Sequence, residues 1–335
     1  MFNLYKLLFY LSLMIGTMIT ISSNSWLGMW MGLEINLLSI IPLFSNSKNM
    51  MNNEAALKYF ITQALASTIM LFTIIILSSN IMYEWETKFN MILNSSLLTK
   101  MGAAPFHFWF PEVIEGINWI NCFLLLTWQK IAPFILIIHN NKMMFFLSII
   151  ILFSMLISGI MGINQTSIRK ILAYSSINHI GWMLASLMFM ESIWMTYFIV
   201  YSIISFNIIM IFNKFNIYYL SQLFNNLNNN PILKIFFIMN FLSLGGLPPF
   251  LGFLPKWLTI QTMINSNLIL LTFIMVVMTL LTLYFYMRIT FTTLMINMNE
   301  LNFNLKKNNK YWITMILNFF SLTGLMFLTI IFNIY

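Results

Sequence analysis

Four ionisable side chains stand alone inside long apolar runs of the sequence: Glu34, Lys100, Lys130 and Lys256. A charge at the centre of a membrane helix costs about 2.5–3.5 kcal/mol on insertion scales, so such residues face a protein interior. Burial disfavours the charged form of a lysine, whereas a nearby carboxylate favours it. A buried lysine whose distance from an acid can change is therefore suited to bind and release a proton. The alternative for each residue is a structural role that only holds helices together.

Two histidines and one arginine are further candidates. His107 and His179 titrate near neutrality and would suit a relay, although a hydrogen-bonded structural role is equally open. Arg288 keeps its proton in proteins, and it either takes part in a relay or marks the inner end of a helix. His139 is expected at an interface, in contact with solvent. The three histidines lack the spacing of metal ligands, so we expect no metal.

The composition excludes a soluble domain and a redox centre. Of the 335 residues, 60% are hydrophobic and only 7% are charged, whereas soluble domains carry about 25% charge. Cys122 is the single cysteine, which excludes an intramolecular disulfide and a cluster that needs several thiolates from this chain. The net charge of +8 is spread over short loops, so we expect no nucleic-acid partner. The chain is predicted to be an all-α polytopic membrane protein.

Apolar runs of spanning length predict about eleven transmembrane helices, at residues 3–22, 26–44, 55–79, 90–110, 116–138, 143–163, 168–189, 192–213, 232–264, 268–296 and 311–334. With the N-terminus inside, only Lys88 and Lys142 lie in outer loops. The inner loops then hold ten cations: Lys6, Lys48, Lys58, Arg169, Lys170, Lys214, Lys234, Lys306, Lys307 and Lys310. This positive-inside bias fixes the orientation, and the odd count places the C-terminus outside.

An internal repeat relates the fourth and ninth spans, which contain GAAPF at 102–106 and GLPPF at 246–250. An offset of five helices turns the second unit over relative to the first, as in the inverted repeats of secondary transporters. We therefore expect one membrane domain, 1–335, made of five-helix repeats at 1–138 and 143–296 and a C-terminal helix at 311–335. The same offset pairs Glu34 with His179, and Lys130 with Arg288.

Proline and glycine predict broken helices beside the lysines. Proline removes a helical hydrogen bond, and in lipid the freed carbonyl needs a new partner. We expect breaks near residues 102–105, beside Lys100, and 245–255, beside Lys256. Pro133 places a third interruption near Lys130.

The residues around these positions resemble the antiporter-like, proton-pumping membrane subunits of respiratory complex I, which are related to subunits of cation/proton antiporters. The resemblance lies in SNSWLGMWMGLEINLLSIIPL, ALKYFITQALAS, KMGAAPFHFWFP, TWQKIAPF, NQTSIRKILAYSSINHIGWM and NFLSLGGLPPFLGFLPKW. It places the family's key glutamate, the lysine of its first broken helix, its central lysine and the lysine of its second broken helix on Glu34, Lys100, Lys130 and Lys256. It implies a proton relay through these residues, powered by quinone reduction elsewhere in the complex.

The resemblance also implies cofactors, partners and location. NADH, FMN, iron-sulfur clusters and ubiquinone would bind other subunits, and this chain has no G-x-G-x-x-G for a nucleotide. Expected partners are other membrane subunits of the complex, including neighbouring antiporter-like subunits, and membrane lipids, with no soluble small-molecule substrate. The family's animal members lie in the mitochondrial inner membrane, here with the N-terminus on the matrix side and the C-terminus on the intermembrane-space side. The 29 methionines and the lack of a transit segment fit synthesis inside the organelle.

Two other functions stay open at this stage. One is an autonomous secondary transporter that moves Na⁺ or a small solute against protons, and the other is a scaffold whose charges only join helices. A relay predicts that Glu34, Lys100, Lys130 and Lys256 lie in a row along the membrane plane, linked by polar side chains, His107 among them, or by water.

Overall fold

The computed structural model describes residues 4–46, 49–79, 85–140, 143–227, 231–295, 318–319 and 324. The chain divides into two compact units, Met1–Ser154 and Met155–Tyr335. Every regular element in the described ranges is a helix, and one isolated antiparallel bridge joins Ser167 to Tyr219. The all-α prediction is therefore confirmed for this part of the chain.

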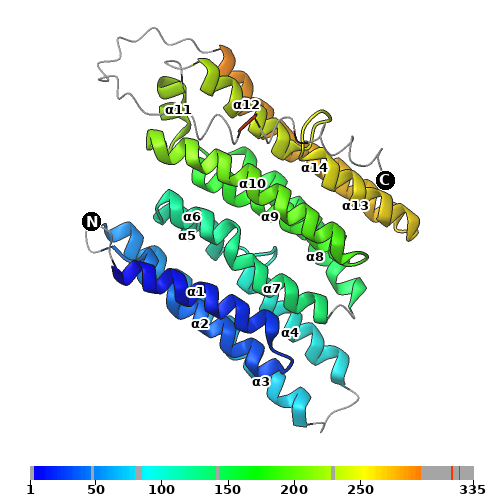
Figure 1. Ribbon diagram of the computed structural model, residues 1–335. Coiled ribbons are helices and arrows are strands. Elements are labelled where there is room, and N and C mark those ends of the chain that lie inside the picture. Colours follow the sequence, from blue (N-terminus) through cyan, green and yellow to red (C-terminus); the bar gives the residue numbers. More distant parts are fainter. Residues whose placement is uncertain are drawn as a thin grey trace. The chain divides into compact units, whose positions relative to one another are not determined.

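The first unit consists of helices that lie side by side with similar axis directions (Figure 1). They are α1 (Leu4–Ser22), α2 (Trp26–Phe44), α3 (Met50–Ser79), α4 (Glu86–Met101), α5 (Trp109–Gly116), α6 (Trp119–Leu126) and α7 (Trp128–His139). The next helix, α8 (Met144–Ile163), crosses the boundary between the units. Within the unit, α2 contacts α1, α3 and α7, and α4 contacts α3 and α7. These contacts bring the segments that carry the candidate residues together.

The second unit is built around one almost completely buried helix, α9 (Ile168–Leu187), which contacts α10, α13 and α14. Only Arg169 and Lys170, in its first turn, are not buried. The other helices in the described part of this unit are α10 (Glu191–Phe215), α11 (Leu220–Leu227), α12 (Pro231–Gly245), α13 (Phe253–Asn265) and α14 (Ile269–Met295). Because neighbours cover α9, its polar residues can sit in an interior rather than in lipid.

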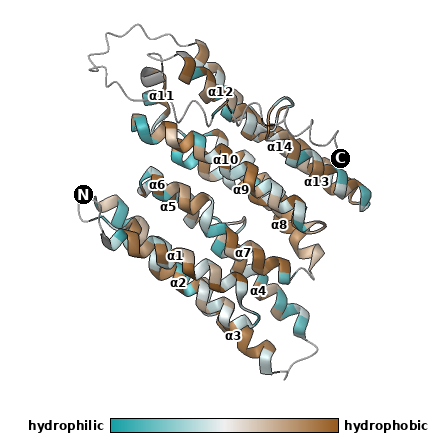
Figure 2. Cartoon of the chain, viewed as in Figure 1, coloured by the Kyte–Doolittle hydropathy of each residue, from teal (hydrophilic) through white to brown (hydrophobic). Residues whose placement is uncertain are grey.

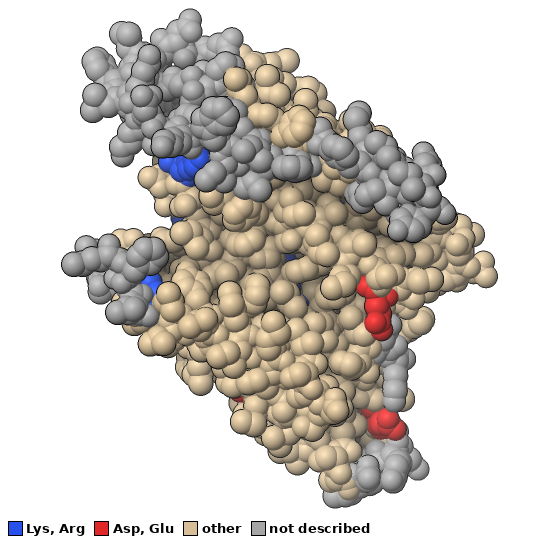
Figure 3. Space-filling model, in the orientation of Figure 1, with Lys and Arg blue, Asp and Glu red and all other residues tan. Residues whose placement is uncertain are grey.

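Within the described residues, seven helical segments are long and apolar enough to cross a membrane: Tyr5–Ser22, Trp26–Phe44, Met50–Ser79, Trp119–His139, Met144–Ile163, Glu191–Phe215 and Ile269–Met295. They coincide with seven of the predicted spans, so these helices have the length and apolar composition that a multi-pass membrane protein requires. Hydrophobic residues run along these helices (Figure 2), and the visible face carries few charged groups (Figure 3). The predicted span at 311–334 lies outside the described residues, apart from 318–319 and 324.

Small residues allow α1 and α2 to pack closely. A Cβ added at Gly32 would lie 2.8 Å from the carbonyl oxygen of Gly16, and one added at Gly16 would lie 3.1 Å from that of Gly32. Close packing of this kind helps to join membrane helices, because lipid offers no hydrophobic driving force between them. This pair anchors the helix that carries Glu34.

Both predicted breaks at the repeated motif are present. The helix α4 ends at Met101 and α5 begins at Trp109, while α12 ends at Gly245 and α13 begins at Phe253. Each first half ends at a glycine with positive φ, 74° at Gly102 and 78° at Gly246. The amides that follow, of Ala103 and Leu247, donate to Leu98 O at 3.1 Å and to Leu242 O at 3.4 Å. These are the reverse bonds that close a helix at an αL glycine.

The fifth predicted span is interrupted at a different residue from the one expected. Pro133 lies inside α7, and the helix is instead interrupted at Thr127, where φ is −119° and ψ is −71°. A proline ring crowds the carbonyl of the preceding turn, so the distortion arises on its N-terminal side. The Thr127 hydroxyl and the Thr127 amide both donate to Phe123 O, at 2.7 and 3.0 Å, and so hold the chain at the interruption. Lys130 therefore follows the interruption by less than one turn.

Candidate functional site

Lys100 lies in the last turn of α4, directly before the first break, and is 7% exposed. Two side chains from neighbouring helices fix this turn: Gln63 Nε2 donates to Lys100 O at 3.4 Å, and Trp109 Nε1 donates to Thr99 O at 3.0 Å. Carbonyl groups at a helix C-terminus carry partial negative charge, which favours a cation there. The break thus supplies both a fixed position and a favourable potential for the ammonium group.

Glu34 of α2 is half-buried, and its Oε1 atom is buried with no hydrogen-bond partner in the described part of the chain. Its carboxylate interacts electrostatically with Lys100. The ion pairs within 4.0 Å among the described residues belong instead to Lys58, which contacts Glu54 and Glu112. Glu34 therefore acts on Lys100 across a gap, without direct contact.

A small cavity of about 10 Å³ lies between α2, α3, α4 and α7. Its lining is rich in polar groups, and the Tyr59 hydroxyl donates to Gln129 Oε1 at 3.3 Å. The full lining consists of Leu33, Asn36, Leu37, Tyr59, Gln63, Lys100, Gln129 and Pro133. Polar side chains therefore extend from Lys100 to the helix that carries Lys130.

Lys130 and His107 are also interior residues of the first unit. Lys130 is 1% exposed, and its Nζ lies 5.4 Å from the centre of the Phe110 ring, a cation-π distance. His107 is 3% exposed, and its Nδ1 lies 3.3 Å from Pro105 O within the connection between α4 and α5. Lys100, Lys130 and His107 are thus all buried in the first unit, close to the chain between the end of α4 and the start of α5.

Lys256 occupies the second unit and is 7% exposed. Its Nζ donates to Gly245 O at 2.8 Å and to Leu244 O at 3.3 Å, the last carbonyls of α12. A Cβ added at Gly246 would lie 2.7 Å from Lys256 Cδ and 2.9 Å from Nζ. Glycine is required at position 246 for two reasons: the positive φ, and the space that the Lys256 side chain occupies.

The two break loops match each other, but their lysines stand on opposite sides of the break. The amide of Phe106 donates to Ala103 O at 2.8 Å, and the amide of Phe250 donates to Leu247 O at 3.1 Å. Lys100 precedes its glycine by two residues. Lys256 follows its own break and reaches back to the carbonyl of Leu244, which holds the corresponding position in the second loop. The sequence places Lys256 after its break, but it did not reveal that the ammonium group reaches back to the end of α12.

His179 of α9 faces the second break within its own unit. Its Nδ1 lies 2.9 Å from the Tyr197 hydroxyl of α10, and its ring centre lies 4.9 Å from that of Tyr201. These three side chains line a cavity of about 10 Å³ together with residues on either side of the break, Ser243, Leu244, Gly252 and Pro255, and with Val200 and Ile204. Polar groups therefore surround the helix end that Lys256 caps.

Sequence reasoning overlooked several of these polar residues: Tyr59, Gln63, Gln129, Tyr197 and Tyr201. The sequence could have indicated them, because each is a glutamine or a tyrosine within an apolar run, and Tyr197 and Tyr201 are four residues apart. Such residues face one side of a helix and need a hydrogen-bonding partner when buried.

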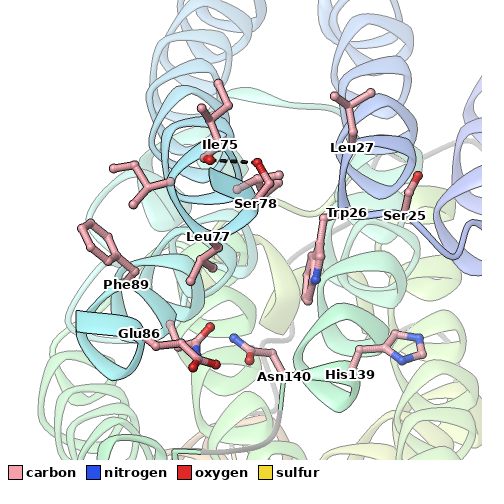
Figure 4. Close-up of a pocket in the computed structure, with 13 residues that line it drawn as sticks. Ser25, Trp26, Leu27, Ile75, Leu77, Ser78, Glu86, Phe89, His139 and Asn140 are labelled. Carbon is pink, nitrogen blue, oxygen red and sulfur yellow. Dashed lines mark hydrogen bonds between the residues drawn. The ribbon is translucent and has the colours of Figure 1, made fainter. Parts of the chain in front are cut away.

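Arg288 and His139 do not join the buried clusters described above. Arg288 is half-buried on α14, and its carbonyl accepts a bond from Thr292 Oγ1 at 2.8 Å. His139 is exposed and lines a larger cavity of about 600 Å³ at the ends of α2, α3, α4 and α7. Figure 4 shows Trp26, Glu86 and Asn140 around the same cavity. Within the described ranges, no three His, Cys, Asp or Glu residues gather as metal ligands.

Comparison with known proteins gives a consistent result. The family model described as "NADH:quinone oxidoreductase/Mrp antiporter, TM" matches residues 23–282. NADH-ubiquinone oxidoreductase chain 2 of Anopheles gambiae and that of Aedes aegypti are each 52% identical over 334 residues, covering 98% of this chain and 98% of the relative.

Solved structures show the same fold. A chain of respiratory complex I from Thermus thermophilus has a TM-score of 0.82 at 22% identity, covering 96% of this chain and 78% of that one. A chain of the Mrp complex from Dietzia sp. DQ12-45-1b has a TM-score of 0.71 at 16% identity, covering 84% of this chain and 59% of that one. The chain therefore belongs to the NADH-ubiquinone oxidoreductase chain 2 family, within the wider NADH:quinone oxidoreductase/Mrp antiporter membrane family.

Proposed function

We propose that this chain is a proton-translocating, antiporter-like membrane subunit of mitochondrial complex I, NADH:ubiquinone oxidoreductase, and that redox chemistry takes place in other subunits. The observation that carries the proposal is the placement of Lys100. It is buried at the end of a broken membrane helix, and the Glu34 carboxylate acts on it across a gap. The family assignment supports the same function.

The arrangement suits a lysine whose protonation depends on its partner. The last carbonyls of α4 and the Glu34 carboxylate favour the charged form of Lys100, whereas burial opposes it. Moving the carboxylate away would leave burial dominant, and the ammonium group would release its proton. Moving it closer would favour uptake. We therefore expect a displacement of α2 relative to α4 to change whether Lys100 takes up or releases a proton.

We assign the relay to Glu34, Lys100, Lys130 and Lys256, with His107 and His179 as further candidates. Support comes from the burial of all three lysines and from the polar cavity that extends from Lys100 to α7. The expected row of these four residues along the membrane plane stays a prediction. An experimental structure of the whole complex that scattered them without a polar path would contradict it.

The proposed architecture has eleven spans, with α4 and α5 as the fourth, and α12 and α13 as the ninth. The five-helix offset of the repeated motif predicts inverted topology, and the matching hydrogen bonds of the two break loops support the repeat itself. The N-terminus would face the matrix and the C-terminus the intermembrane space, within the mitochondrial inner membrane. Other membrane subunits, neighbouring antiporter-like subunits and lipids would cover the exposed apolar residues of helices such as α1.

The direct test compares two lysines of α4 in the assembled complex. Lys100→Met should strongly reduce the number of protons moved per NADH oxidised in proteoliposomes, while the complex still assembles. Lys88→Met makes the same exchange at an exposed position of the same helix, where the ammonium lies 3.7 Å from the centre of the Trp85 ring, and it should pump normally. Full pumping by the Lys100→Met complex would refute the proposal. Loss of assembly instead of pumping would favour the scaffold function.

An autonomous cation/proton antiporter is the second candidate, because the matching family model also covers Mrp antiporter subunits. In that case the purified chain alone should exchange Na⁺ for protons in liposomes. We expect no such exchange, because the subunit depends on a complex whose redox reaction supplies the energy.

A further inference from the structure

The cavity beside Lys100 has the composition of a binding site for a small polar molecule. Four of its polar residues are buried: Asn36 and Tyr59 are each 3% exposed, Gln63 is 4% exposed, and Lys100 is 7% exposed. Buried polar groups are costly unless they form hydrogen bonds, so each of these groups needs a partner.

Two of the hydrogen bonds hold the walls of the cavity in place. The Tyr59 hydroxyl donates to Gln129 Oε1 at 3.3 Å, and Gln63 Nε2 donates to Lys100 O at 3.4 Å. These bonds join α3 to α7 and to α4. They also orient the Gln129 amide, because its oxygen is held by the tyrosine.

Two polar groups of Gln129, its side-chain Nε2 and its main-chain carbonyl, are available to hydrogen-bond a further partner. Its Nε2 is buried and has no hydrogen-bond partner among the described residues. Its main-chain carbonyl would normally accept a bond from the amide four residues later, but that residue is Pro133, which has no N–H. Gln129 therefore presents a donor and an acceptor in a segment that lines the cavity.

The size of the cavity limits what can bind there. A single water molecule needs roughly 10–15 Å³ of accessible space and between about two and four polar partners. The cavity provides about 10 Å³. A sodium ion would need several close oxygen ligands. An organic solute would need a larger volume. The chemistry and the volume together fit one water molecule.

We propose that Gln129 and Tyr59 form a water-binding site that positions the ammonium group of Lys100. The water accepts hydrogen bonds from Lys100 Nζ and from Gln129 Nε2 and donates to the main-chain carbonyl of Gln129, and Tyr59 holds Oε1 so that Nε2 faces the water. Because Glu34 does not contact Lys100 directly, this water gives the charged lysine a partner inside the membrane. Gln129 and Tyr59 are positioning residues, and this role rests on the proposed function.

The first test is an experimental structure of the whole complex at a resolution that shows water. Density for one water molecule is expected within hydrogen-bond distance of Lys100 Nζ and of Gln129. A structure without water between these residues would overturn the proposal. This test needs no variant, so it decides the matter even if a substitution prevents folding.

The second test removes the amide from the assembled complex. Gln129→Met keeps the approximate volume and should slow proton translocation about tenfold, as expected when a charged group loses a hydrogen bond of roughly 1.5 kcal/mol. Gln129→Asn retains an amide and room for the water, so it should recover most of the rate. Gln261→Met makes the same exchange on the exposed face of α13 and should have no effect.

A double substitution separates positioning from packing. If Tyr59 acts only by orienting Gln129, then Tyr59→Phe should slow translocation alone but add nothing in the Gln129→Met complex. Equal pumping by the Gln129→Met and Gln261→Met complexes would overturn this inference and leave the proposed function intact. Full pumping by Lys100→Met would instead overturn the proposed function, and with it the role inferred for the water.

Discussion

Lys256 and Gly245 form a hydrogen bond across the second break, with Nζ of the lysine 2.8 Å from the carbonyl oxygen of the glycine. The lysine belongs to α13 and the glycine ends α12, so the ammonium group joins the two halves of one interrupted span. In lipid, an unsatisfied carbonyl costs several kcal/mol. The same group that is a candidate proton carrier therefore also stabilises the helix end that the break creates.

Gly246→Ala should disturb this contact. The φ of 78° disfavours any residue with a Cβ, by about 1–2 kcal/mol, and the new methyl group would lie 2.9 Å from Lys256 Nζ. We expect a lower melting temperature of the complex and slower proton translocation. Gly245→Ala is the matched control, because its Cβ would be 3.7 Å from the nearest atom, in Tyr286. If both complexes behaved alike, the steric explanation would be wrong.

Lys256→Arg tests whether the residue must lose its proton. Arginine can still donate to the carbonyls of Leu244 and Gly245, but it does not deprotonate in proteins. The complex should therefore assemble while proton translocation through this subunit is strongly reduced. The measurement is protons moved per NADH oxidised, next to the content of assembled complex. Normal pumping would show that Lys256 only caps the helix.

Glu34→Gln removes a charge and keeps the shape of the side chain. Because the carboxylate favours the charged form of Lys100 without touching it, the change should slow proton uptake with little effect on assembly. Glu86→Gln makes the same exchange at an exposed position in the first turn of α4 and should be silent. Proteoliposome pumping rates of the two complexes provide the comparison, and equal rates would exclude Glu34 from the relay.

The long spans and the two break loops could be predicted from sequence because their causes are local. Hydrophobic length identifies a span, and a glycine followed by proline within a few residues prevents a continuous helix. The interruption at Thr127 could not be predicted, because it lies more than one turn before Pro133, beyond the carbonyl that the proline ring itself crowds. Its place depends on how the neighbouring helices pack.

The partners of the candidate residues depend on tertiary contacts that no spacing rule provides. Gln63 reaches Lys100 across 37 residues of sequence, and Tyr59 reaches Gln129 across 70. The residue types suggested a relay. The polar groups that surround Lys100 could be identified only from the packing of the helices in the first unit. Which carbonyl groups the Lys256 ammonium reaches is likewise decided by how α13 packs against the end of α12.

Tyr197→Phe tests whether His179 takes part in proton transfer or only in packing. The substitution removes the hydroxyl that lies 2.9 Å from His179 Nδ1 and preserves the ring. If the pair belongs to a relay near the second break, proton translocation should slow while the melting temperature of the complex stays close to normal. The control is Tyr284→Phe, which removes a hydroxyl from a tyrosine that is 56% exposed on α14. A fall in melting temperature with unchanged pumping would assign His179 a structural role, because the lost hydrogen bond would then have served packing alone.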